Sequence, residues 1–168
     1  MRVLVTAASR HGSTAEIAAA LAAQLVRCGL DVTVKPPDGD ADPAEYDAVV
    51  LGSAVYTGRW LDVARTFAQE HWYELRQRPV WLFSSGPIGD PLQPVEEGTD
   101  GARLLGALGA RGHRVFPGRL DRAELGFAET IITRMIRAPD GDFRDFAEIR
   151  TWAEEIGRAL LGAREVAR

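Results

Sequence analysis

The sequence contains a single cysteine, Cys28, among 168 residues. A lone thiol excludes an internal disulfide and any zinc or iron–sulfur site built from several cysteines, so we expect no bound metal. Basic residues do not exceed acidic ones, because the formal net charge is −4. A protein without a basic excess lacks a charged face for nucleic-acid phosphates, so we also expect no nucleic-acid partner.

Long hydrophobic runs are missing as well. The apolar run within residues 1–6 is too short for a signal peptide, and no run approaches the roughly 20 residues that a membrane-spanning helix needs. We therefore expect a cytoplasmic protein without an integral membrane segment. No repeat, low-complexity tract or linker divides the chain, and its length suits a single domain over residues 1–168.

Short apolar runs alternate along the chain with longer segments of helical periodicity. The expected strands are 3–6, 31–35, 48–51, 80–83 and 113–117. The expected helices are 14–27, 61–75, 102–108, 123–137 and a last one from Asp145 to Leu161. Capping boxes are predicted at Ser13–Glu16 and at Asp145–Glu148. This alternation predicts an α/β fold: a doubly wound, five-stranded parallel sheet of order 2-1-3-4-5 with helices on both faces.

Ligands of such sheets bind beyond the carboxyl ends of the strands, here in the loops 7–13, 53–60 and 84–90. The first loop joins a strand to a helix N-terminus, where free N–H groups and the helix dipole favour an anion. Its candidate phosphate-binding residues are Ser9, Arg10, His11, Gly12, Ser13 and Thr14. A plain helix cap is the alternative, and it accounts for Ser13 and Glu16 but not for the whole cluster.

Several phosphate chemistries are excluded by what this loop lacks. A Walker loop needs Gly-Lys-Ser/Thr, a dinucleotide fingerprint needs three spaced glycines, and only Gly12 is present. The acidic residues of a receiver domain are absent after the first and third strands. Cys28 lies beyond the first helix and cannot serve as a phosphatase nucleophile in the loop; we expect it to be a packed helix-end residue.

The second and third loops suit a planar ring. Tyr56 can stack on an aromatic ligand or seal the next helix onto the sheet, and Trp60 is equally suited to packing or to the rim of a site. Small residues of the third loop offer N–H groups to the edge of a ring, although the same residues also make ordinary turns. The candidate ring-binding residues are Ala54, Val55, Tyr56, Thr57 and Gly58, then Ser84, Ser85, Gly86, Pro87, Ile88 and Gly89. His71 and His113 are expected to be structural.

Three stretches carry a resemblance to a known family: Ser9–Ala18, Gly52–Gly58 and Gly141–Phe146. On these stretches the chain resembles the flavodoxin-domain family that includes the menaquinone-dependent protoporphyrinogen dehydrogenases. The resemblance implies a flavodoxin-like fold and FMN as the cofactor. It further implies that residues 9–14 hold the FMN phosphate and that residues 55–58 and 84–89 flank the flavin ring.

The resulting hypothesis is an FMN-binding redox protein, either an electron carrier or an FMN-dependent oxidoreductase. Its partner would be a redox protein, a small molecule or a quinone acceptor. The alternatives are a protoporphyrinogen dehydrogenase-like enzyme and a flavin-free interaction protein of the same fold. No residue is assigned as an acid–base catalyst. Four acidic residues near the third loop are expected to disfavour anionic substrates and membrane surfaces: Asp90, Glu96, Glu97 and Asp100.

Overall fold

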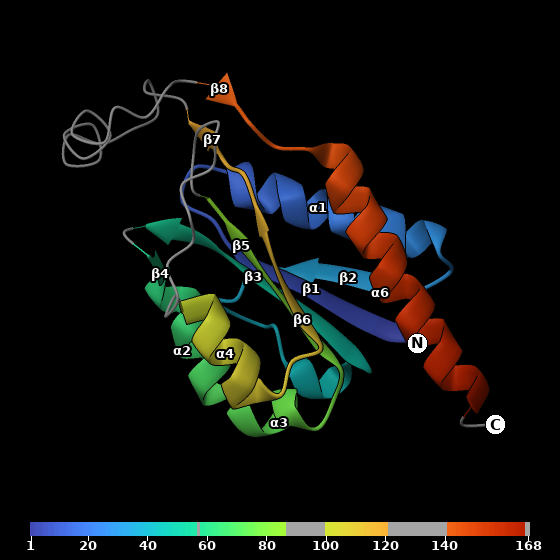
Figure 1. Cartoon of the computed structure of the whole chain (residues 1–168). Coiled ribbons are helices and arrows are strands. Elements are labelled where there is room, and N and C mark those ends of the chain that lie inside the picture. The colour runs from blue at the N-terminus through green and yellow to red at the C-terminus, as the bar shows by residue number, and fades with distance from the viewer. Residues whose placement is uncertain (57, 87–99, 121–140, 167–168) are drawn as a thin grey trace.

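The computed structural model describes residues 1–56, 58–86, 100–120 and 141–166 (Figure 1). Its strands are β1 Arg2–Ala8, β2 Asp31–Lys35, β3 Ala48–Tyr56, β4 Arg59–Trp60, β5 Val80–Ser85, β6 Gly112–Phe116, β7 Arg119–Leu120 and β8 Gly141–Asp142. Its helices are α1 Ser13–Arg27, α2 Asp62–Glu70, α3 Trp72–Arg76, α4 Asp100–Leu108 and α6 Phe146–Val166, with a 3-10 turn at Pro43–Glu45. The helix predicted over 123–137 lies outside the described residues.

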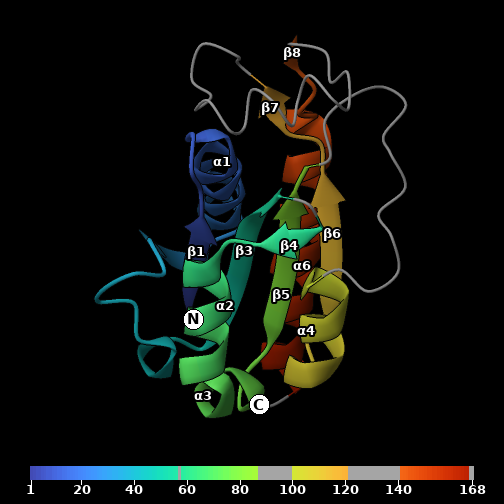
Figure 2. The same ribbon diagram turned by 90° about the vertical axis from the view of Figure 1, so that its left-hand side faces the viewer.

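The main sheet has the strand order β2-β1-β3-β5-β6, all parallel, which confirms the predicted fold and order. Strands β3 and β5 lie in the middle because their uninterrupted apolar runs can be covered on both faces. Figure 2 shows these strands ending at one edge of the sheet, below the β7–β8 pair. Among the described residues, no helix is long and apolar enough to cross a membrane.

Helices cover both faces of the sheet, as predicted. Side chains alternate along β1, so that Val3 and Val5 face α1 and α6 whereas Leu4 faces the other layer. The first layer packs Leu21 of α1 with Trp152 of α6 over this face. The second layer contains α2, α3 and α4, and it is visible below the sheet in Figure 1. Both faces therefore have a continuous apolar core, and the strand ends are left to carry the site.

Three strands are longer than predicted, and the first of them, β1, covers Arg2–Ala8 instead of 3–6. Strand β3 continues to Tyr56 instead of ending at Leu51, and β5 includes Ser84 and Ser85. The extension of β3 forms because β4 turns back and pairs with it in antiparallel fashion, at Val55↔Trp60 and Tyr56↔Arg59. The second predicted loop is therefore largely a β-hairpin, which holds its side chains on a sheet and not on an irregular loop.

The helix termini correct two further predictions. The segment predicted as one helix over 61–75 is divided at His71, whose backbone leaves the helical region at φ −102° and ψ 24°. The capping box predicted at Ser13–Glu16 is wrong: Gly12 is the N-cap, in a left-handed conformation with φ 80°, and the described residues make no side-chain cap hydrogen bond there. At the last helix, Asp145 does cap α6, accepting from the N–H groups of Ala147 at 2.8 Å and Glu148 at 3.0 Å.

The centre of the sheet has one position where only glycine fits. A Cβ atom added to Gly52 of β3 would lie 2.2 Å from the ring of Phe83 on the neighbouring strand. Phe83 is itself fully buried and packs edgewise on Trp152, with ring centroids 6.5 Å apart. Because the Phe83 ring is enclosed by its neighbours, a side chain at position 52 would force β3, β5 or this ring to shift.

We predict that Gly52→Ala lowers the free energy of unfolding by about 1–3 kcal/mol, the usual cost of overpacking a core. Gly162→Ala is the matched control, because Gly162 lies within α6 and nothing surrounds the added Cβ within 4 Å. That change should raise the free energy of unfolding by roughly 0.5–1 kcal/mol. Urea unfolding of both variants measures the difference. Equal free energies of unfolding for Gly52→Ala and Gly162→Ala would show that the Phe83 ring can move aside.

Candidate functional site

The three predicted ligand-binding loops, which we now call the first, second and third segments, meet in their described parts at the carboxyl edge of the sheet. The register pairs Ala8 with Ser53 and Ala54 with Ser85, so the ends of β1, β3 and β5 lie side by side. Residues 9–12 then lead from β1 into α1, and Gly86 follows β5. This is the arrangement in which a doubly wound sheet binds its ligands.

The first segment carries a buried hydroxyl group that nothing in the described part of the chain satisfies. Ser9 Oγ is inaccessible to solvent and has no hydrogen-bond partner there. An unsatisfied buried polar group costs roughly 1–3 kcal/mol, so its presence at a predicted ligand loop points to an absent partner. The Thr14 side chain is also buried, at 2% exposure, while Arg10 and Gly12 are exposed and His11 and Ser13 are half-buried.

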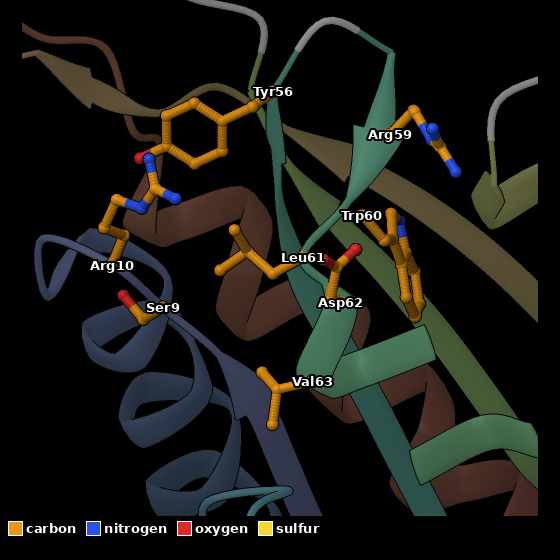
Figure 3. Close-up of a pocket in the computed structure, with 8 residues that line it drawn as sticks. All are labelled: Ser9, Arg10, Tyr56, Arg59, Trp60, Leu61, Asp62 and Val63. Carbon is orange, nitrogen blue, oxygen red and sulfur yellow. The ribbon is translucent and has the colours of Figure 1, made fainter. Parts of the chain in front are cut away.

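A pocket of about 390 Å³ opens between this segment and the β3–β4 hairpin (Figure 3). Its volume lies within the range of about 300–1,000 Å³ that is usual for small-molecule sites. The lining residues are Ser9, Arg10, Tyr56, Arg59, Trp60, Leu61, Asp62 and Val63. The Arg10 guanidinium carbon is 5.1 Å from the centroid of the Tyr56 ring, a cation–π distance. Figure 3 shows Tyr56 directed toward Arg10 and Arg59 directed away from both.

The hairpin is held in place by a buried hydrogen-bond chain. Trp60 Nε1 donates to Ser84 Oγ at 2.8 Å, and Ser84 Oγ is 2.8 Å from His113 Nε2. Burial lowers the pKa of His113, which favours the neutral ring that can accept a hydrogen bond from the Ser84 hydroxyl. Two backbone bonds complete the anchor, from Trp60 N–H to Asp100 Oδ2 at 3.0 Å and from Leu61 N–H to Ser53 Oγ at 2.9 Å.

This hydrogen-bond chain shows where three residues considered in the sequence analysis lie. Trp60 is 2% exposed, so of its two predicted roles the structure shows packing, with one edge on the pocket. His113 is structural, as predicted. Ser84 is predicted to flank the ring; its hydroxyl is engaged with Trp60 and His113, and its backbone is paired on both sides to β3 and β6.

Some of the remaining candidate ring-binding residues lie within the described part of the chain, and the others lie outside it. Ala54 and Ser85 are buried, Val55 and Tyr56 are half-buried, and Gly58 is exposed with φ 77°. Gly86 has φ 107° and donates its N–H to the Phe116 carbonyl at 2.9 Å. The predicted ring-binding residues Thr57, Pro87, Ile88 and Gly89 lie outside the described part of the chain.

The charge expected beside the third segment needs a correction at Asp100. Its carboxylate is 3.9 Å from Arg65 Nε and 3.8 Å from Arg103 in α4, and its side chain is only 13% exposed. Two guanidinium groups therefore compensate this charge, and its Oδ2 is also bound to the backbone N–H of Trp60. The other three acidic residues, Asp90, Glu96 and Glu97, lie outside the described residues.

Sequence reasoning missed two arginines that contact the first turn of α1. Arg119 and Arg144 both lie within 3.5 Å of Glu16, from segments more than one hundred positions away in the chain. The sequence signal nearest to them is the stretch Gly141–Phe146, which was noted only for its family resemblance. No group of His, Cys, Asp and Glu side chains that could hold a metal ion occurs among the described residues.

Comparisons with known proteins agree with the geometry. Residues 4–146 match the model of a flavodoxin domain. The chain is 29% identical over 86 residues to protoporphyrinogen IX dehydrogenase [quinone] of Escherichia coli K12, a match over 50% of this chain and 48% of that protein. The chain thus spans about half the length of the curated relatives it matches.

Solved structures show the same fold at low identity. A flavodoxin from the domain Archaea superposes with a TM-score of 0.64 and 17% identity over 95% of this chain and 98% of that one. The rubredoxin oxygen:oxidoreductase of Desulfovibrio gigas superposes with a TM-score of 0.63 and 17% identity over 96% of this chain and 36% of that one. With the family model matched over residues 4–146, the chain belongs to the flavodoxin domain family.

Proposed function

We propose that this domain binds FMN at the carboxyl edge of its sheet and uses it for electron transfer. The observation that carries the proposal is the buried hydroxyl of Ser9, which has no hydrogen-bond partner among the described residues and lies beside an α1 N-terminus without a side-chain cap in the same part of the chain. A phosphate accepts hydrogen bonds at both places, and the helix dipole favours its charge. The membership of the family supports the proposal, because flavodoxin domains typically bind FMN.

The residues present fit the two halves of this cofactor. Ser9, Ser13, Thr14 and the backbone of residues 10–12 would hold the phosphate. The exposed face of Gly12, where an added Cβ would meet nothing within 4 Å, leaves the backbone open to close approach. Ala54–Tyr56, Gly58, Ser85 and Gly86 would border the ring, with Tyr56 as its stacking partner. Thr57, Pro87, Ile88 and Gly89 remain predicted ring contacts, and the Ser84 side chain is not among the contacts we propose.

Bound FMN would supply the electron chemistry, while the protein supplies binding and orientation. No described side chain is placed as an acid–base catalyst. We therefore propose a redox protein whose partner is another redox protein, a small molecule or a quinone. The cytoplasmic location stays a prediction of the sequence.

We predict that the protein binds FMN more tightly than riboflavin, and that Ser9→Ala removes much of this preference. Loss of a hydrogen bond to a charged phosphate should weaken FMN by roughly 1.5–3 kcal/mol and leave riboflavin nearly unchanged. Because the Ser9 hydroxyl has no partner in the described chain, the same change should not lower the stability of the FMN-free protein. Calorimetric titration with both flavins, and urea unfolding without them, measure the two effects.

Thr6→Val is the matched control for this variant. The Thr6 hydroxyl is also buried and unsatisfied among the described residues, but it lies within β1 on the fully covered part of the strand. Its removal should stabilise the protein without changing the affinity for FMN. Equal affinities of wild-type protein for FMN and riboflavin would contradict the phosphate site.

Tyr56 provides a separate test of the ring position. We predict that Tyr56→Ala weakens FMN and restores fluorescence to the flavin that remains bound, because stacking on the ring is lost. Tyr56→Phe keeps the aromatic face and should retain both the affinity and the quenching. Fluorescence titration measures both quantities. Full quenching in Tyr56→Ala would place another residue over the flavin ring.

A second candidate function is favoured by the match to the protoporphyrinogen IX dehydrogenase of Escherichia coli. The compensated charge of Asp100 removes one of the four acidic residues that argued against an anionic substrate. We still expect weak or absent oxidation of a porphyrinogen with a quinone acceptor. An assay of porphyrin formation by the FMN-loaded protein decides between the two candidates, and robust quinone-dependent turnover would promote the second.

A further inference from the structure

Two distant segments converge on the first turn of α1. The Arg119 backbone N–H donates to Ser13 Oγ at 3.2 Å, and its guanidinium lies 3.4 Å from Glu16 Oε1. Arg144 donates to Glu16 Oε2 at 2.8 Å and to the Ser13 carbonyl at 3.3 Å. Figure 1 shows β7 and β8, which carry or adjoin these arginines, at the N-terminal end of α1. We call Arg119, Arg144, Glu16 and Asp142 the charge cluster.

Arg144 is the central member of the charge cluster. Its side chain is only 3% exposed, and it forms a two-pronged contact with Asp142, from Nε to Oδ1 at 2.7 Å and from a terminal nitrogen to Oδ2 at 2.6 Å. The hydrogen bond from Arg144 lowers the pKa of Asp142, and the same bond raises the pKa of Arg144. Both charges are thereby kept, and the antiparallel pairing of Arg119 with Asp142 aligns the two segments.

The charge cluster neutralises the negative charge that Glu16 places at the N-terminus of α1. A carboxylate in the first turn interacts favourably with the positive end of the helix dipole, but it repels a phosphate bound at the same helix end. The two arginines and two carboxylates of the cluster have no net charge. Removing Arg144 alone would leave one negative charge in excess beside the proposed phosphate site, whereas removing the charges of Arg144 and Glu16 together would restore neutrality.

The same contacts also orient Ser13. A hydroxyl group has one proton to donate and two lone pairs with which to accept. Because the Arg119 N–H occupies one lone pair of Ser13 Oγ, the hydroxyl remains able to donate its own proton to an acceptor. A phosphate oxygen is such an acceptor. The contact of Arg144 with the Ser13 carbonyl holds the backbone of this residue from the other side.

We propose that Arg144, together with Arg119, is a positioning residue that makes the N-terminus of α1 selective for the phosphate of the flavin. It acts by neutralising Glu16 and by fixing Ser13, and it does not touch the ring. The inference rests on the proposed FMN function and adds to it the residues that set the preference for FMN over riboflavin.

The test compares the affinities of FMN and riboflavin in Arg144→Ala, by calorimetric titration. We expect the preference for FMN to fall about tenfold, with a smaller change for riboflavin. Adding Glu16→Gln to this variant should restore most of the preference, because the charge excess is gone. A purely structural role of Arg144 would not be relieved by removing Glu16. Arg144→Lys keeps the charge without the two-pronged contact and should keep most of the preference for FMN over riboflavin. This variant can be measured if Arg144→Ala fails to fold.

Arg114→Ala is the matched control. Arg114 lies in β6 and pairs with two carboxylates of α6, Glu155 at 3.3 Å and Glu148 at 3.7 Å. Its loss should leave the preference for FMN over riboflavin unchanged. Wild-type protein that binds neither flavin overturns the proposed function and the inference with it. Wild-type protein that prefers FMN, with the same preference in Arg144→Ala, overturns the inference alone.

Discussion

The uncapped N-terminus of α1 is the constraint on which the candidate site depends. The first N–H groups of any helix lack partners within the helix and need one from elsewhere. Here Gly12 turns the chain in a left-handed conformation, and among the described residues no side-chain cap hydrogen bond forms at this helix end. The serine and glutamate that sequence rules assign to a capping box are bound instead to Arg119 and Arg144. We propose that the FMN phosphate is the partner of this helix end and of the buried hydroxyl of Ser9 beside it.

The opposite side of the site depends on the core of the sheet. The hydrogen bonds from Trp60 to Ser84 and on to His113 join the β3–β4 hairpin to β5 and β6. Because burial lowers the pKa of His113, its ring is suited to accept from Ser84 in the neutral form. The hairpin that presents Tyr56 is consequently anchored to β5 and β6 by these hydrogen bonds, and the two sides of the pocket are fixed by different parts of the fold.

The sheet order and the three segments at its edge could be predicted from the sequence, because uninterrupted apolar runs and helical periodicity identify the elements and parallel crossovers restrict their order. Other features depend on contacts between distant residues. The extension of β3 to Tyr56 requires β4 as its partner, and the capping box failed because Arg119 and Arg144 compete for Ser13 and Glu16. The compensation of Asp100 by Arg65 likewise becomes visible only when α2 and α4 are packed together.

The central claim is that the end of α1 and Ser9 bind the phosphate of FMN, and phosphorus NMR tests it most directly. Free FMN has a phosphate that loses its second proton with a pKa of about 6. If the phosphate is enclosed by the N–H groups and hydroxyls of residues 9–14, its resonance should move on binding and stay constant as the pH is varied through that range. A resonance that keeps the position of free FMN and titrates as it does would contradict the account.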